Sequence, residues 1–291
     1  MARGSAVLLA LALVCAGLAG ATNESPRLAF VRYALAGEGH GRQPHAIYVF
    51  ERGRARRLRV PIDDADSPAW SPDRSRLAFH AGGTVYVARA DGTEARGIAR
   101  GAGPAWSPDG TRLALARQKR DSRLSSIWIV RADGGGERRV TYGSIDLQPS
   151  WSRNGRALAF LRIDPRTYAS GIWTVRSDGR QLRRILGRLK NVTQPVWSPT
   201  QDVLVVSDGA RLIVTRPGGA AQRVVARLHA DAKGARIDPQ PAWSRDGRQL
   251  AFAQPRREAV GRSDIWLVGA DGSGLRRLMR SPGADRDPDL R

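Results

Sequence analysis

The chain has 291 residues, and 48 lysine and arginine residues against 27 acidic residues give it a formal net charge of +21. Its length suffices for an ordinary hydrophobic core, and its single cysteine excludes a scaffold held by internal disulfides. The charge would suit an anionic polymer, but the arginines are scattered and form no run of five or more. Most of this charge is therefore interpreted as a solvated surface.

Residues 1–21 predict a secretory signal peptide. A positive residue, Arg3, precedes a short apolar run over residues 6–14, and small residues from Ala19 to Ala21 match a cleavage site. The apolar stretch is shorter than the roughly 20 residues that a membrane-spanning helix needs. The alternatives are an uncleaved membrane anchor or a lipid on Cys15, although Val14 directly before the cysteine fits a lipidation signal poorly. We predict a secreted or periplasmic protein in which residues 22–291 form one domain.

One unit recurs along the rest of the chain. The sequence Pro-x-Trp-Ser occurs five times, and a short apolar triplet starts nine residues after each proline. The prolines are Pro68, Pro104, Pro149, Pro195 and Pro241, and the triplets start at Leu77, Leu113, Leu158, Leu204 and Leu250. A sixth, unpaired triplet starts at Leu28, and successive triplets start 36 to 49 residues apart. A repeat of this length is typical of propellers and solenoids.

Each unit predicts four short strands. Pro-x-Trp begins the first strand, a turn such as Asp109-Gly110 follows, and the apolar triplet forms the second strand. The third strand alternates and carries an aromatic residue in most units, as in Ile127-Trp128-Ile129, and a second turn such as Asp133-Gly134 leads to a basic fourth strand. Six such units predict an all-β fold, a six-bladed β-propeller of four-stranded blades.

The two ends of the chain predict closure of the ring. The first unit lacks its Pro-x-Trp strand, and Pro288 stands 47 residues after Pro241, where a further copy of that strand would lie. Pairing the C-terminal segment with the N-terminal segment would remove two open sheet edges. A stacked solenoid, the alternative, would instead need capped end units.

The unit from Pro104 to Gly110, Pro-Ala-Trp-Ser-Pro-Asp-Gly, resembles the repeat of TolB-like propellers, and the resemblance covers about residues 25–291. It implies a periplasmic or secreted propeller with a protein-binding surface. Full-length TolB carries an additional α/β domain before its propeller, for which this chain has no space, so its bridging role is not carried over whole. Similar repeats form the propeller of prolyl-oligopeptidase-type enzymes, whose hydrolase domain has no counterpart here.

Catalytic and cofactor motifs are missing from the sequence. GxSxG, HExxH and Walker-type loops do not occur, and His40, His45, His80 and His229 share no metal-ligand spacing. We therefore predict no enzyme, no cofactor and no metal site, and we expect the histidines at the surface. The tryptophans occupy equivalent places in the repeat, which favours a role in the core between blades.

The predicted topology separates two faces of the disc. Both Asp-Gly turns of each blade lie on one face, whereas the loops between strands two and three lie on the other, with the connections into each Pro-x-Trp. These loops differ in length, and irregular loops on a rigid scaffold are common binding sites. Polar residues before the prolines are expected to ring the channel on this face: Asp64, Asp66, Asp146, Gln148, Gln194, Asp238, Gln240, Asp285 and Asp287.

These residues could bind a cation or a basic, extended peptide, or they could only solvate the channel. A basic rim is expected around them, formed by Arg117, Lys119, Arg120, Arg123, Arg256, Arg257 and Arg262. The first functional hypothesis is a monomeric, non-enzymatic binding module that contacts a protein or an anionic envelope component, and no nucleic acid. The alternatives are a propeller-class lyase or hydrolase acting on an acidic glycan, and electrostatic retention on cell-wall polyanions.

Overall fold

The computed structural model describes residues 27–34, 45–186 and 192–290. The predicted signal peptide and His40 lie outside these residues. Within the described ranges every regular element is a β-strand. No helix in this part of the chain is long and apolar enough to cross a membrane.

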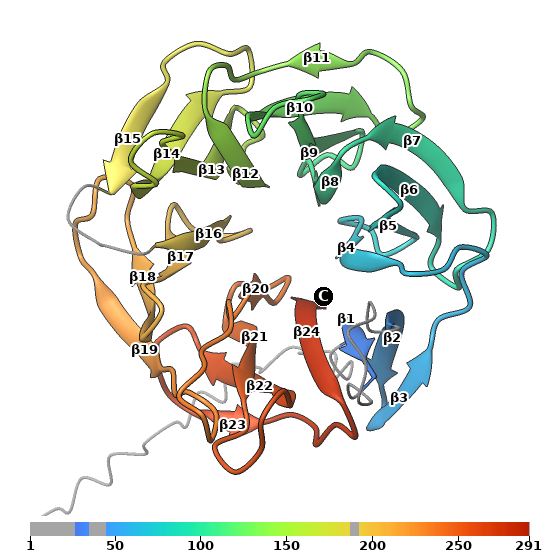
Figure 1. Cartoon of the computed structure of the whole chain (residues 1–291), viewed down its shortest axis with the longest axis vertical. Helices are drawn as coiled ribbons and strands as arrows, with labels where there is room; N and C mark the ends of the chain where they lie inside the picture. The colour runs from blue at the N-terminus through green and yellow to red at the C-terminus, as the bar shows by residue number, and fades with distance from the viewer. Residues whose placement is uncertain (1–26, 35–44, 187–191, 291) are drawn as a thin grey trace, which may run out of the picture.

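The described strands form a ring of four-stranded antiparallel blades, as predicted (Figure 1). The innermost strands are β4 (Asp66–Trp70), β8 (Ala102–Trp106), β12 (Ile145–Trp151), β16 (Thr193–Trp197), β20 (Ala242–Trp243) and β24 (Ala284–Leu290). The second strands are β5 (Arg76–Ala81), β9 (Arg112–Gln118), β13 (Ala157–Ile163), β17 (Leu204–Ser207), β21 (Gln249–Pro255) and β1 (Leu28–Tyr33).

The third strands are β6 (Thr84–Arg89), β10 (Ser125–Arg131), β14 (Ser170–Arg176), β18 (Arg211–Thr215), β22 (Ser263–Gly269) and β2 (His45–Glu51). The outermost strands are β7 (Arg96–Arg100), β11 (Arg138–Arg139), β15 (Arg183–Leu186), β19 (Arg223–Arg227), β23 (Arg276–Arg277) and β3 (Arg54–Arg57). Blade 1 consists of β24, β1, β2 and β3, and blades 2 to 6 follow in chain order.

Ring closure joins the two ends of the described chain. β24 pairs antiparallel with β1, from Leu290 opposite Leu28 to Ala284 opposite Tyr33, so the C-terminal segment supplies the innermost strand of blade 1. Figure 1 shows this strand beside β1 at the centre of the disc. The predicted closure by the terminal segments is therefore confirmed.

The first hairpin explains why three of the five Trp-Ser units continue as Trp-Ser-x-Asp, ending at Asp73, Asp109 and Asp246. In blade 3, Ser107 Oγ donates to Asp109 Oδ1 (2.5 Å) and accepts the backbone N–H of Arg112 (3.0 Å). Asp109 Oδ1 also accepts the N–H of Thr111 (3.0 Å). Gly110 has a φ of +67°, which glycine adopts without steric cost. The side chains thus satisfy the backbone of a tight turn.

The hydrophobic core lies between neighbouring blades. Trp106 and Leu113 of blade 3 pack against Val85 and Ile98 of blade 2, and equivalent clusters fill the other seams. Each fully buried aliphatic side chain of this kind stabilises the fold by about 1.5–3 kcal/mol. The five Pro-x-Trp tryptophans are thus core residues, as predicted, whereas the third-strand Trp128, Trp173 and Trp266 are only partly buried.

The tryptophan indoles also tie the innermost strands to one another. Trp106 Nε1 donates to the carbonyl oxygen of Ala69 in the preceding blade (2.9 Å). The same bond runs from Trp151 to Ala105 (3.1 Å) and from Trp243 to Val196 (3.0 Å). A buried indole needs such a partner, and here it holds adjacent blades in register around the ring.

Part of the positive charge lies at the circumference. Each outermost strand begins with an arginine, and these six first residues are exposed. The charged outer strands keep the exposed sheet edges from pairing with other chains.

Candidate functional site

The residue before the innermost proline has a left-handed backbone in every blade. The φ values are 50° for Ser67, 59° for Gly103, 54° for Gln148, 24° for Gln194, 46° for Gln240 and 50° for Asp287. Residues before proline normally favour the extended region, so these positions are strained. In five blades the pairing register of the innermost strand shifts at this point, which marks a β-bulge. Bulges of this kind re-aim side chains and often adjoin functional sites.

The re-aimed side chains meet across the ring. Gln148 of blade 4 donates through Nε2 to Asp238 Oδ2 (3.1 Å), which precedes blade 6. Gln148 Oε1 accepts the N–H of Gln194 (3.1 Å), and Gln240 Oε1 accepts the N–H of Asp287 (3.1 Å). We call Asp66, Gln148, Gln194, Asp238, Gln240 and Asp287 the channel mouth. Each innermost strand begins here, at the same height as the loop between strands two and three, because Asp66 pairs with His80 at the end of β5.

The channel mouth holds three interacting carboxylates. Burial, together with the negative charges of Asp66 and Asp238, raises the pKa of Asp287 to about 7. Asp238 accepts hydrogen bonds from Gln148, from Thr193 Oγ1 (3.0 Å) and from the N–H of Gln240 (3.3 Å). No lysine or arginine of the described chain lies within 4.0 Å of the carboxylate of Asp238 or Asp287. The mouth is therefore rich in acceptors and is not neutralised by close ion pairs.

Two histidines adjoin Asp66. The N–H of Gly83 donates to His80 Nε2 (3.1 Å), so Nδ1 carries the proton and donates to Asp66 Oδ1 (2.9 Å). His45 Nε2 lies 3.9 Å from Asp66 Oδ2, and His45 Nδ1 lies 3.8 Å from Asp64. The side chain of His45 is only 4% exposed, so the expectation that the histidines lie at the surface is wrong for this residue.

Asp146 and Asp285 do not contribute to the mouth, contrary to expectation. Both side chains are fully buried, and each receives two hydrogen bonds from an arginine of the neighbouring second strand. Arg162 Nε and Nη2 lie 2.6 and 2.7 Å from the Asp146 oxygens, and Arg32 holds Asp285 in the same way. A carboxylate in a dry interior requires such a partner, which leaves it unavailable to a ligand.

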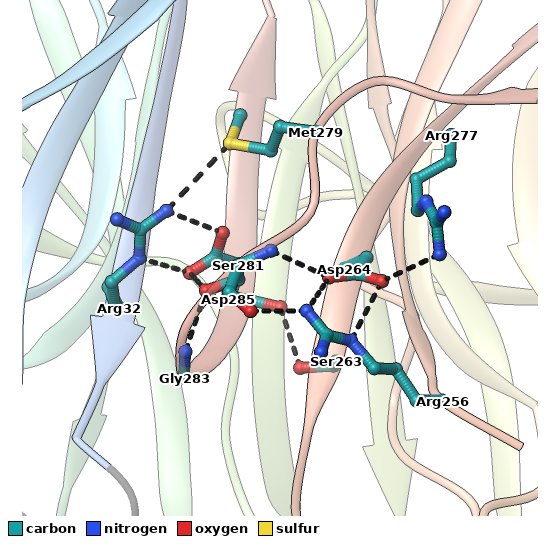
Figure 2. Close-up of polar contacts among 9 residues, drawn as sticks. All are labelled: Arg32, Arg256, Ser263, Asp264, Arg277, Met279, Ser281, Gly283 and Asp285. Carbon is teal, nitrogen blue, oxygen red and sulfur yellow. Dashed lines mark hydrogen bonds and ion pairs between the residues drawn. The ribbon is translucent and has the colours of Figure 1, made fainter. Parts of the chain in front are cut away.

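The basic rim is only partly where it was expected. Lys119, Arg120 and Arg257 are exposed on loops of this face. Arg256 is buried instead, because it donates to both oxygens of Asp264 and to the carbonyl oxygen of Ser281 (Figure 2). Arg117 pairs with Glu137 (2.8 Å), so it contributes little net charge.

A cavity of about 380 Å³ occupies the centre of the ring. Every blade lines it through the proline, or the residue after it, of the innermost strand: Pro68, Ala105, Pro149, Pro195, Pro241 and Pro288. Gln194 also lines this cavity, and its buried Oε1 has no hydrogen-bond partner in the described chain. Pro72, Pro108 and Pro199, which belong to the first-hairpin turns on the opposite face of the disc, also line this cavity, so it extends from Gln194 toward that face. The described residues contain no group of three or more His, Cys, Asp or Glu side chains that could hold a metal ion.

The sequence indicated most of the mouth but missed His45 and Thr193. His45 begins β2, away from the repeat prolines, so the repeat gives no signal for it, whereas Thr193 stands two residues before Pro195, the place that Asp66 takes before Pro68. The sequence does contain a signal for the burial of Asp146. Arg162 stands four residues after the first residue of its apolar triplet, as Arg32 does in the first unit, and both arginines bind a buried aspartate.

Comparison with known proteins agrees with this architecture. The family model described as TolB beta propeller domain matches residues 25–232. No curated protein sequence matches the chain. The structure of TolB from Acinetobacter baumannii superimposes with a TM-score of 0.71 at 16% identity, over 91% of this chain and 66% of that chain. The present chain thus spans slightly less than two thirds of that protein.

Two further solved structures share the fold. Putative TolB from Agrobacterium tumefaciens has a TM-score of 0.68 at 16% identity, over 90% of this chain and 91% of that chain. A chain of a nidogen/laminin complex has a TM-score of 0.67 at 13% identity, over 91% of this chain and 98% of that chain. Likeness at such low identity concerns the fold alone, and it does not extend to the residues of the channel mouth.

Proposed function

Because the chain belongs to the TolB beta propeller domain family, we propose that it is a non-enzymatic, extracytoplasmic binding module that holds a protein partner at its channel mouth. A binding or scaffold role is what the family fold suggests. The signal-peptide pattern supports a place outside the cytoplasm. The nidogen/laminin chain, a propeller of a protein complex, supports a protein partner.

The excess of acceptors at the channel mouth is the observation that carries this proposal. Asp66, Asp238 and Asp287 repel one another electrostatically, and Gln194 Oε1 adds a buried acceptor without a donor. A ligand with several hydrogen-bond donors and positive charge would neutralise the carboxylates and bind the unpaired oxygen. Hydrogen bonds between cations and carboxylates are about twice as strong as neutral ones. A basic, extended segment of a partner protein has this chemistry.

The enzymatic alternative receives less support from this site. It would need a base and a charge-stabilising group that converge on one substrate position. His80 has both ring nitrogens engaged, by Asp66 and by the N–H of Gly83. We therefore propose no reaction at the mouth.

Retention on an anionic envelope polymer is the second candidate. The exposed arginines that begin the outermost strands favour it, because they form a positive belt around the disc. Such contacts would need no defined pocket and would weaken steeply with salt.

Affinity capture from envelope extracts distinguishes these functions. The wild-type protein is compared with the double variant Asp238→Asn/Asp287→Asn, which keeps the shape of both side chains. The control, Glu94→Gln/Asp202→Asn, removes the same charge from exposed residues on the turns of the other face. We expect a partner that survives high salt with the wild type and the control but is lost with the mouth variant.

Retention of every specific partner by the mouth variant would refute the channel-mouth proposal. Loss of all captured material at high salt, equally for the three proteins, would instead favour the polymer function.

A further inference from the structure

The third-strand aromatic residue is covered by an arginine in three blades. The guanidinium carbon of Arg32 lies 4.6 Å from the ring centre of Tyr48, that of Arg117 4.3 Å from Trp128, and that of Arg162 5.0 Å from Trp173. These arginines all stand four residues after the first residue of the apolar triplet. Such cation–π contacts shield the aromatic face from other ligands.

Blade 6 departs from this pattern. Its third-strand aromatic residue is Trp266, and the residue in the place of the arginine is Gln254. No arginine of the described chain stacks on Trp266. One side of Trp266 packs against the core between blades 5 and 6, where Val225, Leu250 and Phe252 lie. The rest of the ring borders open space.

A pocket of about 620 Å³ opens beside Trp266, at the outer seam of blades 5 and 6. Its lining includes the side chains of Val224, Leu275, Arg227, His229, Gln254 and Arg257. A smaller pocket of about 240 Å³ shares Trp266, His229 and Arg257 with it. Sites for small molecules usually measure about 300–1,000 Å³ and combine an apolar wall with a few polar groups.

Gln254 provides an unsatisfied acceptor in this pocket. Its side chain is nearly inaccessible, with a residue exposure of 2%, and its buried Oε1 has no hydrogen-bond partner in the described chain. Buried polar atoms are satisfied in the great majority of folded proteins, so an orphan that lines a pocket indicates a donor supplied from outside.

The charge around the pocket is positive. Arg227, Arg256, Arg257 and Arg277 line the two pockets, against Glu258 and Asp264, which leaves a net charge of +2. Asp264 is already held by Arg256 (2.7 Å) and Arg277 (3.5 Å), as Figure 2 shows. Arg257 is exposed and has no close acidic partner in the described chain. Burial and the nearby arginines lower the pKa of His229, which favours the neutral ring.

We propose that this pocket binds an acidic sugar residue, a hexuronate of a polysaccharide or oligosaccharide. The apolar C–H face of the sugar ring would lie on Trp266, and a hydroxyl group would donate to Gln254 Oε1. The sugar carboxylate would pair with Arg257, whose planar guanidinium matches a carboxylate through two parallel hydrogen bonds. A single ligand would thereby contact the uncovered ring of Trp266, the unpaired Oε1 of Gln254 and the positive charge of Arg257. The site lies apart from the channel mouth and does not depend on the proposed protein partner.

Binding of trigalacturonate, measured by titration calorimetry, tests the proposal. Maltotriose is the neutral control probe, and triglutamate represents an acidic peptide. The variants Gln254→Leu and Arg257→Ala each remove one contact, and Arg120→Ala is the matched control because Arg120 is an exposed loop arginine of blade 3. We expect saturable binding of trigalacturonate that weakens about tenfold in each pocket variant and stays within about twofold in the control.

Gln254→Leu removes a buried acceptor oxygen that has no hydrogen-bond partner, so no hydrogen bond is lost and the variant should keep or raise the melting temperature. That measurement separates lost binding from lost folding. The proposal is overturned if trigalacturonate does not bind saturably, if maltotriose or triglutamate binds equally well, or if a folded Gln254→Leu protein binds like the wild type.

Discussion

Arg32 and Asp285 lie 253 positions apart in the sequence, yet Arg32 Nε and Nη2 donate to the two oxygens of Asp285 at 2.7 and 2.9 Å. In blade 4 the equivalent pair, Arg162 and Asp146, is separated by only 16 positions. The same type of ion pair is therefore local in blade 4, whereas in blade 1 it joins the first and the last strand of the described chain. Figure 2 shows that Ser281 links this pair to blade 6, because its hydroxyl donates to Asp285 and its backbone N–H donates to Asp264.

Removing the arginine of this pair should destabilise the closed ring strongly. Arg32→Met leaves Asp285 buried without its partner, and breaking a buried ion pair in this way costs about 3–5 kcal/mol. Burial already raises the pKa of Asp285 despite the opposing charge of Arg32. The loss should therefore be larger at pH 8 than at pH 5, where Asp285 can take up a proton.

Urea unfolding of Arg32→Met, with Arg89→Ala as the control, checks this prediction. The pair between Arg89 and Glu94 is mostly exposed, and we expect its loss to cost less than about 1 kcal/mol. Equal losses for the two variants would contradict a structural role for the closing pair.

The raised pKa of Asp287 predicts that the stability of the protein depends on pH. Its pKa is about 7 in the folded protein, above the ordinary value of 3.8, so the folded state binds this proton more tightly than the unfolded state. The free energy of unfolding should therefore fall as pH rises from about 4 to about 7, by at most about 1.4 kcal/mol per pH unit. Solvent in the channel will reduce this value.

Asp287→Asn should remove that dependence, because the amide resembles the protonated acid and keeps an acceptor oxygen. We expect the variant to match the wild type near pH 4 and to exceed its stability near pH 8. Denaturant midpoints at both pH values measure the difference, and a gap that does not change with pH would show that Asp287 is ionised throughout.

The indole bonds between blades predict a difference between two similar substitutions. Trp243 Nε1 donates to Val196 O (3.0 Å), whereas the buried Nε1 of Trp197 has no partner in the described chain. Trp243→Phe and Trp197→Phe remove the same volume from similar seams, but only Trp243→Phe deprives a carbonyl group of its donor. We expect Trp243→Phe to cost about 1 kcal/mol more in urea unfolding. The reverse order would contradict this account of the seams.

Ending the chain after Gly283 should abolish the closed monomer. The deletion removes β24, whose Leu290 is fully buried, and exposes the edge of β1 and the seam of blade 6. Open, apolar strand edges pair with other chains, so we expect aggregates or oligomers. Size-exclusion chromatography with light scattering measures the outcome, and a stable monomer with unchanged melting temperature would contradict the importance of closure.

The repeat made most of the architecture predictable from sequence. Turn pairs such as Asp109-Gly110 and the spacing from Pro104 to Leu113 are local signals, and local chemistry decides where hairpins form. Pro288 identified the closing strand because it continued the spacing of the series. The positive φ at Gln148 and Asp287 could not be predicted, because residues before proline ordinarily avoid that region.

Asp146 and Asp238 show where sequence and tertiary structure divide. Both stand three residues before an innermost proline, so the repeat alone assigns them the same place. In blade 4 the second strand presents Arg162, which captures Asp146 in a buried ion pair, whereas blade 6 presents Gln254 and leaves Asp238 to the channel mouth. The sequence by itself determined the strands, the number of blades and the closure, because these follow from periodic apolar burial and turn chemistry. Only the tertiary structure decided which carboxylates reach a ligand, because a buried charge must pair with whichever cation the neighbouring strand brings within reach.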